Sequence, residues 1–552
     1  MALPSHALST AAFLAAALLM NSCAYKHTQA DLVVRNARIV SMDGAGTEYT
    51  AMAIKDGRIL ELGAEYQIIN RYRAKEVLDA GTRMVYPGFI DGHAHFLGHG
   101  LNKLKVDLSG AESWSEVLRR TAAYAQAHPG NGWILGRGWD QHLWPDQANP
   151  TNDSMNILFP DRPVLLQRVD GHAAVVNQEA LTSAGLHAGS TVLGGLLEKR
   201  DGQLTGLLLD NAVSVFQQVF NDVDEATKRD ALLDAQRDCF AAGLTMVCDA
   251  GLDAGTIELI KRMHAEGTLK IRLYAMLTDD SLNLQRYAQG PFISDRLVVR
   301  AVKCYADGAL GSRGALLLKP YSDDPAAGHG LQLASREHFL QVAKWCKDKG
   351  FQMATHCIGD SANRLLLGVY DEVLHGTNDL RWRIEPAQCL DPADLPLFGR
   401  NNIIPSVQPV HATSDMGWAI DRLGSERLEH AYAWKRLMQQ SGLLALGTDF
   451  PVEAIDPLAT FRAAVIRKNA QGEPPEGFQM RDALTRTEAL RGLTIWNALA
   501  TFTEQDLGSL EVGKSADFVV VDRDLEQVSE EQLAKARVKA TYVNGEAVWS
   551  EL

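Results

Sequence analysis

The densest group of residues able to do chemistry lies at positions 87–95, where the chain reads Pro-Gly-Phe-Ile-Asp-Gly-His-Ala-His. His93 and His95 are two residues apart and follow an apolar run and an Asp-Gly pair. Where an extended segment ends and twists, two such imidazoles can point at one ion, and neutral imidazole is a common ligand of divalent metals. The pattern predicts a metal site, against the alternative of two surface histidines.

The elements that must position these residues alternate along the middle of the chain. Strand-like apolar runs are separated by helix-length segments, which is typical of a parallel α/β sheet. Several runs end in His, Asp or Lys, as the active face of a barrel requires at the carboxyl ends of its strands. We therefore predict a (β/α)8 TIM-like barrel over 87–501, with strands that include 244–248, 297–302, 351–354, 403–407 and 443–446.

Both ends of the chain carry short strand-like runs instead. Turn signals at 55–58 and at Asn544-Gly545 mark hairpins. We expect 31–86 and 502–552 to form one small composite β-sandwich domain. The stretch of about 101–230 does not follow the barrel rhythm and is rich in Trp and Gly, so we interpret it as an insertion over the barrel mouth.

The first 30 residues differ from the rest. An apolar run at 11–20 has the length of a signal-peptide core and is too short to span a bilayer. Cys23 follows it in a context that resembles a bacterial lipobox, which would make it the lipidated first residue. Soluble export with cleavage after Ala24 or Ala30 is the competing interpretation, and a buried helix is a third. We expect an exported protein, periplasmic or anchored to the membrane as a lipoprotein.

Composition excludes several classes of protein. The 552 residues are 46% hydrophobic and 22% charged, which is typical of a globular enzyme with a large core. A formal net charge of −14 argues against a nucleic-acid partner. The remaining six cysteines form no CxxC pair, and the apolar neighbours of Cys248 and Cys304 predict buried strand cysteines.

The segment at 87–95 resembles the first-strand signature of the amidohydrolase superfamily. The rest of the chain from Asp31 resembles amidohydrolase family 3, the YtcJ-like branch that includes N-substituted formamide deformylases. Motifs similar to that branch recur in order: G-W-D at 138–140, D-G-H at 170–172, V-K at 302–303, D-G-A-L-G-S-R at 307–313, H-C-I-G-D at 356–360, R-I-E at 383–385, G-T-D-F-P-V at 447–452 and G-S-L-E-V-G-K-S-A-D at 508–517.

The resemblance implies further metal ligands. Lys303 matches a lysine that is often carbamylated and then bridges two metals; a salt bridge with Asp307 is the alternative. His356 matches the next ligand. Asp449 would bind metal and act as general base, because a carboxylate beside a metal-bound water can take its proton and pass it to the leaving amine.

One position departs from the family pattern. The branch reads R-I-E-H-A-Q where this chain has R-I-E-P-A-Q, so Pro386 replaces a histidine that would bind the second metal. The protein is then a one-metal hydrolase, or a neighbour such as Glu385 or His411 substitutes, or activity is impaired. We favour one strongly held metal.

Other residues are candidates for the substrate pocket. His172 would polarise the substrate carbonyl, against the alternative of a structural histidine. His411 follows a strand-like run and is predicted to face the site. Arg313 and Trp139 are predicted to shape the substrate pocket, although core packing is the alternative for Trp139 as it is for Trp144.

The sequence therefore predicts a metal-dependent amidohydrolase that cleaves a C–N bond in a small amide substrate. Zinc, at one or two ions per chain, is the expected divalent metal because mixed histidine and carboxylate ligands suit it. A deaminase or cyclic-amide hydrolase would retain the same residues, and a non-catalytic binding or regulatory protein would explain Pro386. A homodimer is common for such folds.

Overall fold

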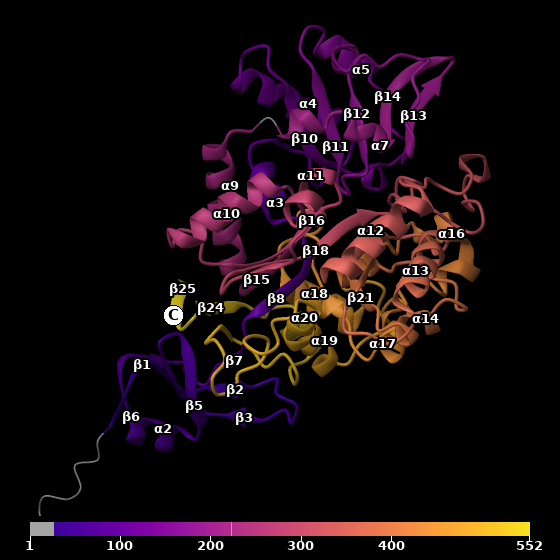
Figure 1. Ribbon diagram of the computed structural model, residues 1–552. Helices are drawn as coiled ribbons and strands as arrows, with labels where there is room; N and C mark the ends of the chain where they lie inside the picture. The colour runs from indigo at the N-terminus through magenta and orange to yellow at the C-terminus, as the bar shows by residue number, and fades with distance from the viewer. Residues whose placement is uncertain (1–26, 222) are drawn as a thin grey trace, which may run out of the picture.

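The computed structural model describes residues 27–221 and 223–552. At its centre is a barrel of eight parallel strands (Figure 1), which confirms the fold class predicted from the sequence. In order around the barrel, the strands are β8 (Phe89–Ala94), β15 (Leu244–Leu252), β16 (Arg272–Thr278), β18 (Leu297–Tyr305), β19 (Gln352–Cys357), β20 (Arg383–Pro386), β21 (Ile404–Val407) and β22 (Ala445–Leu446).

The end of β22 returns to β8. The backbone N–H of Asp449 donates to the carbonyl of His93 at 2.8 Å, and that of His95 donates to the carbonyl of Phe450 at 2.8 Å. A short strand, β17 (Phe292–Ile293), pairs antiparallel with β18 outside this ring. The two backbone bonds bring the first and last strands of the barrel together at their carboxyl ends.

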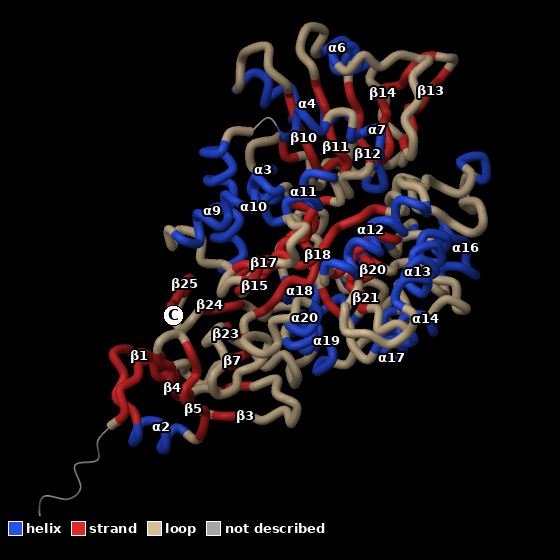
Figure 2. The backbone as a smooth tube through the Cα atoms, viewed as in Figure 1, coloured by secondary structure: helices blue, strands red, loops and turns tan. Residues whose placement is uncertain are grey.

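Barrel strands are continuous buried runs because helices cover their outer face and side chains fill their inner face. All six residues of β19 are buried, and so are the first six of β16. The helices that surround the strands (Figure 2) are α9 (Glu225–Ala241), α10 (Ala254–Ala265), α11 (Ser281–Arg286), α12 (Arg336–Lys349), α13 (Asp360–Leu374), α14 (Pro396–Arg400), α15 (Pro409–Asp415), α16 (Ala419–Leu428), α17 (Trp434–Ser441), α18 (Pro457–Ile466), α19 (Arg486–Gly492) and α20 (Ile495–Ala500).

Strands from both ends of the chain form two further sheets beside the barrel (Figure 1). Leu32 and Ile54 of one sheet share a core with Phe518 and Tyr542 of the other. One sheet has the order β5 (Arg58–Gly63), β4 (Ala51–Lys55), β1 (Thr28–Arg35) and β6 (Tyr72–Asp79); the other has the order β25 (Glu546–Ser550), β24 (Val538–Val543), β23 (Phe518–Val521), β7 (Met84–Pro87), β2 (Arg38–Val40) and β3 (Glu48–Tyr49).

Strand β1 begins at Thr28, inside the export segment predicted for residues 1–30. Thr28 to Ala30 are already strand residues, paired with Tyr72 to Ala74 of β6. Cleavage after Ala30 would therefore remove part of a sheet, because backbone pairing already begins at Thr28. Cys23 lies outside the described residues.

The chain between α3 (Phe96–Asn102) and α9 forms a separate sheet, drawn at the top of Figure 1. The two flanking helices are in close contact, since a Cβ on Gly100 would lie 2.0 Å from the carbonyl oxygen of Ala231. The inserted sheet has the order β13 (Gly195–Arg200), β14 (Gln203–Asp210), β12 (Ala173–Val176), β11 (Val164–Arg168), β10 (Ile134–Trp139) and β9 (Val106–Asp107), with helices α4 (Trp114–Ala127), α5 (Asp153–Leu158), α6 (Gln178–Ser183), α7 (Asn211–Ser214) and α8 (Gln217–Asn221).

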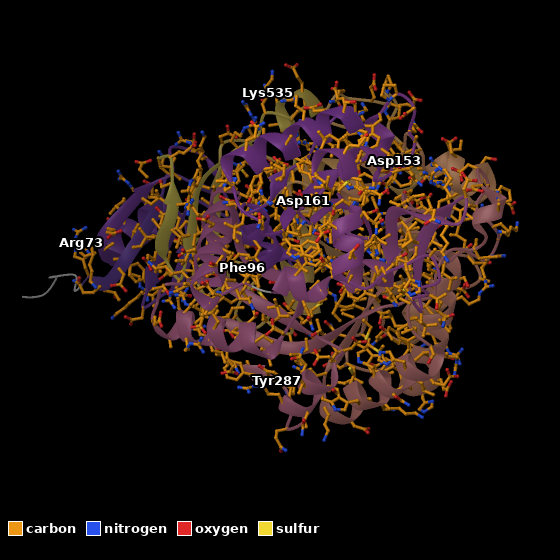
Figure 3. The ribbon with its side chains drawn as sticks, turned by 90° about the horizontal axis from the view of Figure 1, so that it is seen from above. Arg73, Phe96, Asp153, Asp161, Tyr287 and Lys535 are labelled. Atoms are coloured by element: carbon orange, nitrogen blue, oxygen red, sulfur yellow. The ribbon has the colours of Figure 1, made fainter. Side chains whose placement is uncertain are left out.

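Charged side chains are spread over the outside of the molecule. In the view from above, the exposed side chains of Arg73 and Lys535 lie at the edge of the molecule, whereas Phe96 is buried (Figure 3). None of the described helices is both long and apolar enough to cross a bilayer. Cys248 and Cys304 are buried strand residues, as predicted.

Candidate active site

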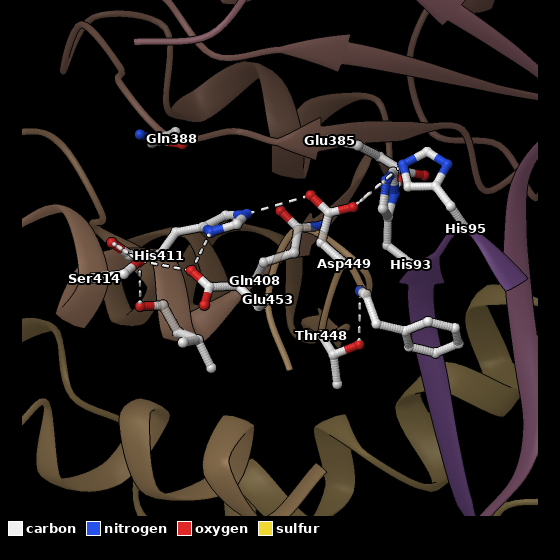
Figure 4. Close-up of polar contacts among 12 residues, drawn as sticks. His93, His95, Glu385, Gln388, Gln408, His411, Ser414, Thr448, Asp449 and Glu453 are labelled. Atoms are coloured by element: carbon white, nitrogen blue, oxygen red, sulfur yellow. Dashed lines mark hydrogen bonds and ion pairs between the residues drawn. The ribbon is translucent and has the colours of Figure 1, made fainter. Parts of the chain in front are cut away.

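Three predicted ligands meet where β8 and β22 end. The ligand atoms of His93, His95 and Asp449 all lie within 4.8 Å of one another. The Nε2 atoms of His93 and His95 are 3.7 and 3.3 Å from Oδ1 of Asp449 (Figure 4). Among residues 27–221 and 223–552, this is the one group of three or more His, Cys, Asp or Glu residues arranged to hold a metal ion.

The Asp-Gly pair before the histidines explains how these two strand ends are joined. Asp91 accepts hydrogen bonds from the backbone N–H of His93 at 3.1 Å and from the Thr448 backbone and hydroxyl at 3.0 and 2.7 Å. A Cβ on Gly447 would lie 2.5 Å from the nitrogen of His93, so the strands approach too closely for a side chain there. Asp449 has a φ of 62°, a left-handed conformation that is uncommon for a residue other than glycine.

Contacts of Asp449 keep its carboxylate ionised. Burial alone would raise its pKa, but contacts with His411 and His95 hold the pKa of Asp449 well below its usual range. His411 Nε2 lies 3.3 Å from Oδ2 of Asp449, and its Nδ1 lies 3.2 Å from Glu453. These two carboxylates raise the pKa of His411 well above its usual value despite burial.

Glu385, a candidate to replace the missing ligand, is engaged elsewhere. Its carboxylate contacts Nδ1 of His93 and lies 2.8 Å from Nε of Arg383, and both Arg383 and Glu385 are fully buried. A carboxylate on the second nitrogen of a metal-binding histidine fixes the ring and its tautomer. Glu385 is therefore placed to orient His93 and leave its Nε2 facing Asp449.

The ends of β18 and β19 carry two more predicted ligands. Lys303 is buried with its ammonium 4.8 Å from the ring centre of Tyr305, and burial lowers the pKa of Lys303 to about 8. Asp307 was the alternative salt-bridge partner predicted for Lys303. Its carboxylate instead accepts backbone hydrogen bonds from Leu316, Ile358 and Gly359. Within the described chain, Lys303 forms no ion pair.

His356 stands beside Lys303, and its Nε2 is buried without a hydrogen-bond partner. Burial lowers the pKa of His356 well below its usual value, so the imidazole is neutral and able to accept a metal. Pro386 ends the neighbouring strand β20, opposite Cys357, and supplies no donor atom. This side of the barrel mouth is therefore poorer in ligands than the β8–β22 side, although the donor set as a whole fits a divalent metal.

His172 comes from the inserted sheet and faces His356, with ring centres 4.9 Å apart. Its Nδ1 lies 2.8 Å from Oδ1 of Asp210, the last residue of β14. Burial alone would lower the pKa of His172, but the hydrogen bond with Asp210 raises it. Asp210 was not singled out from the sequence, although an apolar strand that ends in Asp is the signal that identified Asp449.

A cavity of about 200 Å³ joins these residues. One wall comes from the barrel, with His356, His411 and Asp449, and the other from the insertion, with Arg168 and His172. Arg168 is itself held at 2.5 Å by both Asp140 and Asp170. A larger cleft of about 1030 Å³, near α18 and β25, contains none of the predicted site residues.

Two predicted pocket residues lie elsewhere. Trp139 is 1% exposed in the core of the inserted sheet, where its indole N–H donates to the carbonyl of Leu166 at 2.8 Å. Arg313 pairs with Asp323 at 2.9 Å and does not line the cavity. Core packing accounts for Trp139 and Trp144, and surface pairing accounts for Arg313.

Comparisons with known proteins agree with this geometry. The sequence profile described as the amidohydrolase family matches residues 76–549. YtcJ of Bacillus subtilis (strain 168) is 30% identical over 93% of this chain and 98% of its own length. An N-substituted formamide deformylase of Arthrobacter pascens is 28% identical over 93% of this chain and 97% of its own.

A solved structure is also similar over nearly the whole chain. It is an uncharacterized metal-dependent hydrolase from Pyrococcus horikoshii OT3, with a TM-score of 0.73 and 28% sequence identity. The match covers 91% of this chain and 99% of that one. The similarity is therefore not confined to the barrel strands but extends over most of the chain.

Proposed function

Because this chain belongs to the amidohydrolase family, we propose that it is a metal-dependent hydrolase that cleaves the C–N bond of a small amide. The observation that carries the proposal is the convergence of His93, His95 and Asp449 on one point. Two imidazoles and a carboxylate suit zinc, which is the metal we propose. The formamide deformylase of Arthrobacter pascens supports an amide-type substrate.

A bound divalent metal would lower the pKa of water and polarise the scissile carbonyl. His93, His95 and Asp449 would hold it, and Lys303 would add a ligand once carbamylated. Asp449 accepts the proton of the attacking water, since its carboxylate is ionised, and then passes that proton to the leaving amine.

His172 acts from the other wall of the cavity. Asp210 occupies its Nδ1, so its Nε2 remains to donate a hydrogen bond to the carbonyl oxygen as negative charge develops there. The raised pKa of His172 favours the protonated ring that this role requires. The insertion thus supplies the electrophilic side of the site and the barrel supplies the base.

A non-catalytic binding protein is the second candidate, and Pro386 is the observation that favours it. A deaminase or a cyclic-amide hydrolase would use the same residues on a different substrate. The retained pair of His93 and Asp449, with Asp449 ionised, supports the hydrolase.

Metal content and turnover distinguish these proposals. Protein purified without chelator is analysed by inductively coupled plasma mass spectrometry and assayed on N-formyl and N-acetyl amines, cyclic amides and aminopurines. We expect about one metal per chain, because Pro386 leaves few ligands for a second metal. We also expect the release of amine from an N-acyl amine. Absence of metal after reconstitution with zinc would refute the hydrolase and favour the binding protein.

A further inference from the structure

A second cavity lies beside the proposed metal site, on the far side of His95. Its volume is about 320 Å³, and its lining includes His95 and Asp249 from the barrel and Lys105, Arg137 and Gln167 from the insertion. Gly251 is also in its wall, and a Cβ there would lie 3.9 Å from Cγ of Lys303 and from the hydroxyl of Tyr305. The cavity therefore reaches the strand ends where the metal would bind.

Arg137 is a partly buried cation that forms no ion pair within residues 27–221 and 223–552. Its Nη2 donates to the carbonyl of Val169 at 3.1 Å, while its Nε is buried without any hydrogen-bond partner. Two buried arginines of the insertion and the barrel, by comparison, are paired with carboxylates: Arg168 with Asp140 and Arg272 with Asp517. A buried guanidinium with donors to spare is costly unless a ligand completes it.

Lys105 is a second unpaired cation in the same wall. Its ammonium donates to Oδ1 of Asn102 at 3.1 Å and lies 5.4 Å from the ring centre of Phe220, and it forms no ion pair within residues 27–221 and 223–552. Burial, and then the charge of Arg137, lower the pKa of Lys105 to about 8. The two cations thus repel each other across the cavity, and neither forms an ion pair in the part of the chain that the structure describes.

Gln167 adds a neutral donor next to Arg137. The two residues are partners in the parallel pairing of β10 and β11, so their side chains leave the sheet on the same face. The carboxylate that shares the cavity, Asp249, accepts a hydrogen bond from the backbone N–H of Leu97 at 3.2 Å at the barrel wall. The insertion wall is consequently positive and the barrel wall is negative.

We propose that Arg137 and Lys105 form a subsite for a carboxylate of the substrate, so that the amide cleaved at the metal site also carries a carboxylate. Arg137 offers donors in the planar arrangement that a carboxylate matches, and Lys105 offers a point charge beside it. Leu97, Leu101, Leu252 and Phe220 also line the cavity, which suits an apolar side chain on the substrate. The substrate class is therefore an N-acyl amino acid with an apolar side chain.

This subsite rests on the proposed hydrolase function, and binding measurements separate the two. N-formyl-phenylalanine and its neutral carboxamide are titrated calorimetrically into the full-length protein, and their hydrolysis is assayed in parallel. We expect the acid to bind about 10- to 100-fold more tightly than the carboxamide, the effect of hydrogen bonds to charged groups. Binding with this preference but without turnover would refute the hydrolase and retain the subsite.

Substitutions assign the preference to the two cations. Arg137→Gln and Lys105→Gln should each reduce the preference at least about tenfold while leaving carboxamide binding unchanged, and Arg137→Lys should restore part of it. Lys103→Gln is the matched control, because Lys103 is more exposed and pairs with Asp238 at 2.6 Å. Equal binding of acid and carboxamide, no binding of the acid at millimolar concentration, or a preference that survives Arg137→Gln would each overturn the subsite.

Discussion

The two sides of the barrel mouth differ in how completely they are equipped. On the side of β8 and β22, His93, His95 and Asp449 contact one another. On the side of β18 to β20, Lys303 and His356 stand next to Pro386, which offers no ligand atom. Proline at position 386 thus leaves the three-residue metal site intact and removes one ligand from the adjacent site. A single metal on the β8–β22 side is enough for the chemistry we propose.

Glu385 links the two sides. It belongs to β20, yet its carboxylate contacts His93 at the end of β8. The β18–β20 side therefore still supports the metal site on the β8–β22 side, because Glu385 fixes the His93 ring that would bind metal. Although position 386 offers no ligand, Glu385 does not replace it, because its carboxylate contacts His93 and Arg383.

Removing the proposed base, Asp449 on the β8–β22 side, should have the largest effect. Asp449→Asn keeps the shape of the side chain but removes the proton acceptor and a metal ligand, and we expect turnover to fall about 10²- to 10⁴-fold. Steady-state kinetics on the best N-acyl amine measures this. Asp506→Asn is the control, because Asp506 is an exposed carboxylate that pairs with Arg58 at 2.8 Å. Near-normal turnover in Asp449→Asn would remove Asp449 from the mechanism.

The insertion wall, where His172 faces His356, is tested by a substitution at Asp210. Asp210→Asn should lower kcat/KM about 10- to 100-fold, because His172 loses the partner that keeps it protonated. Since Asp210 raises the pKa of His172, its loss lowers that pKa, and the alkaline limb of the pH profile should move to lower pH.

A matched His–Asp pair at the surface provides the control for this variant. His338 lies 2.8 Å from Asp279, and Asp279→Asn should leave the pH profile unchanged. An unaltered alkaline limb in Asp210→Asn would show that a protonated His172 does not stabilise the carbonyl oxygen. Circular dichroism of both variants checks that the inserted sheet is intact.

The difference between the two walls also marks the limit of sequence analysis. Several barrel strands are apolar runs that stop at His, Lys or Asp, so the sequence pattern predicted His93, and the resemblance to a known family added Lys303 and Asp449. The inserted sheet lacks that rhythm, and the partners His172 and Asp210 lie 38 residues apart. Arg137 was hidden for the same reason, since only the fold shows its place in the cavity wall and its unpaired Nε.

Side-chain direction was equally inaccessible. The sequence offered Glu385 as a substitute ligand, but only the fold shows that its carboxylate is taken by His93 and Arg383. The same holds for Trp139, for which the sequence left a pocket residue and core packing open, and whose side chain packs into the core of the insertion.

Cutting the link between the two sides should weaken metal binding. Glu385→Gln retains size but loses the charge that orients His93, and we expect metal affinity to fall about 10- to 100-fold in competition with a chelator. Arg383 would lose its partner, so thermal unfolding is measured as well and affinity is compared on folded protein. Glu372→Gln, at an exposed pair with Arg336, is the control. Unchanged affinity in Glu385→Gln would mean that His93 needs no support from β20.

Restoring the missing ligand should have the smallest effect on the first metal and the clearest effect on the second. Pro386→His places an imidazole beside His356 and Lys303, and we expect the content to rise from about one to about two metals per chain when bicarbonate is supplied for carbamylation of Lys303. Pro386→Ala separates loss of the proline from gain of the imidazole and should stay at one. A content of one in both variants would mean that the two sides differ by more than residue 386, whereas a content of two in the unaltered protein would mean that the β18–β20 side already binds metal without it.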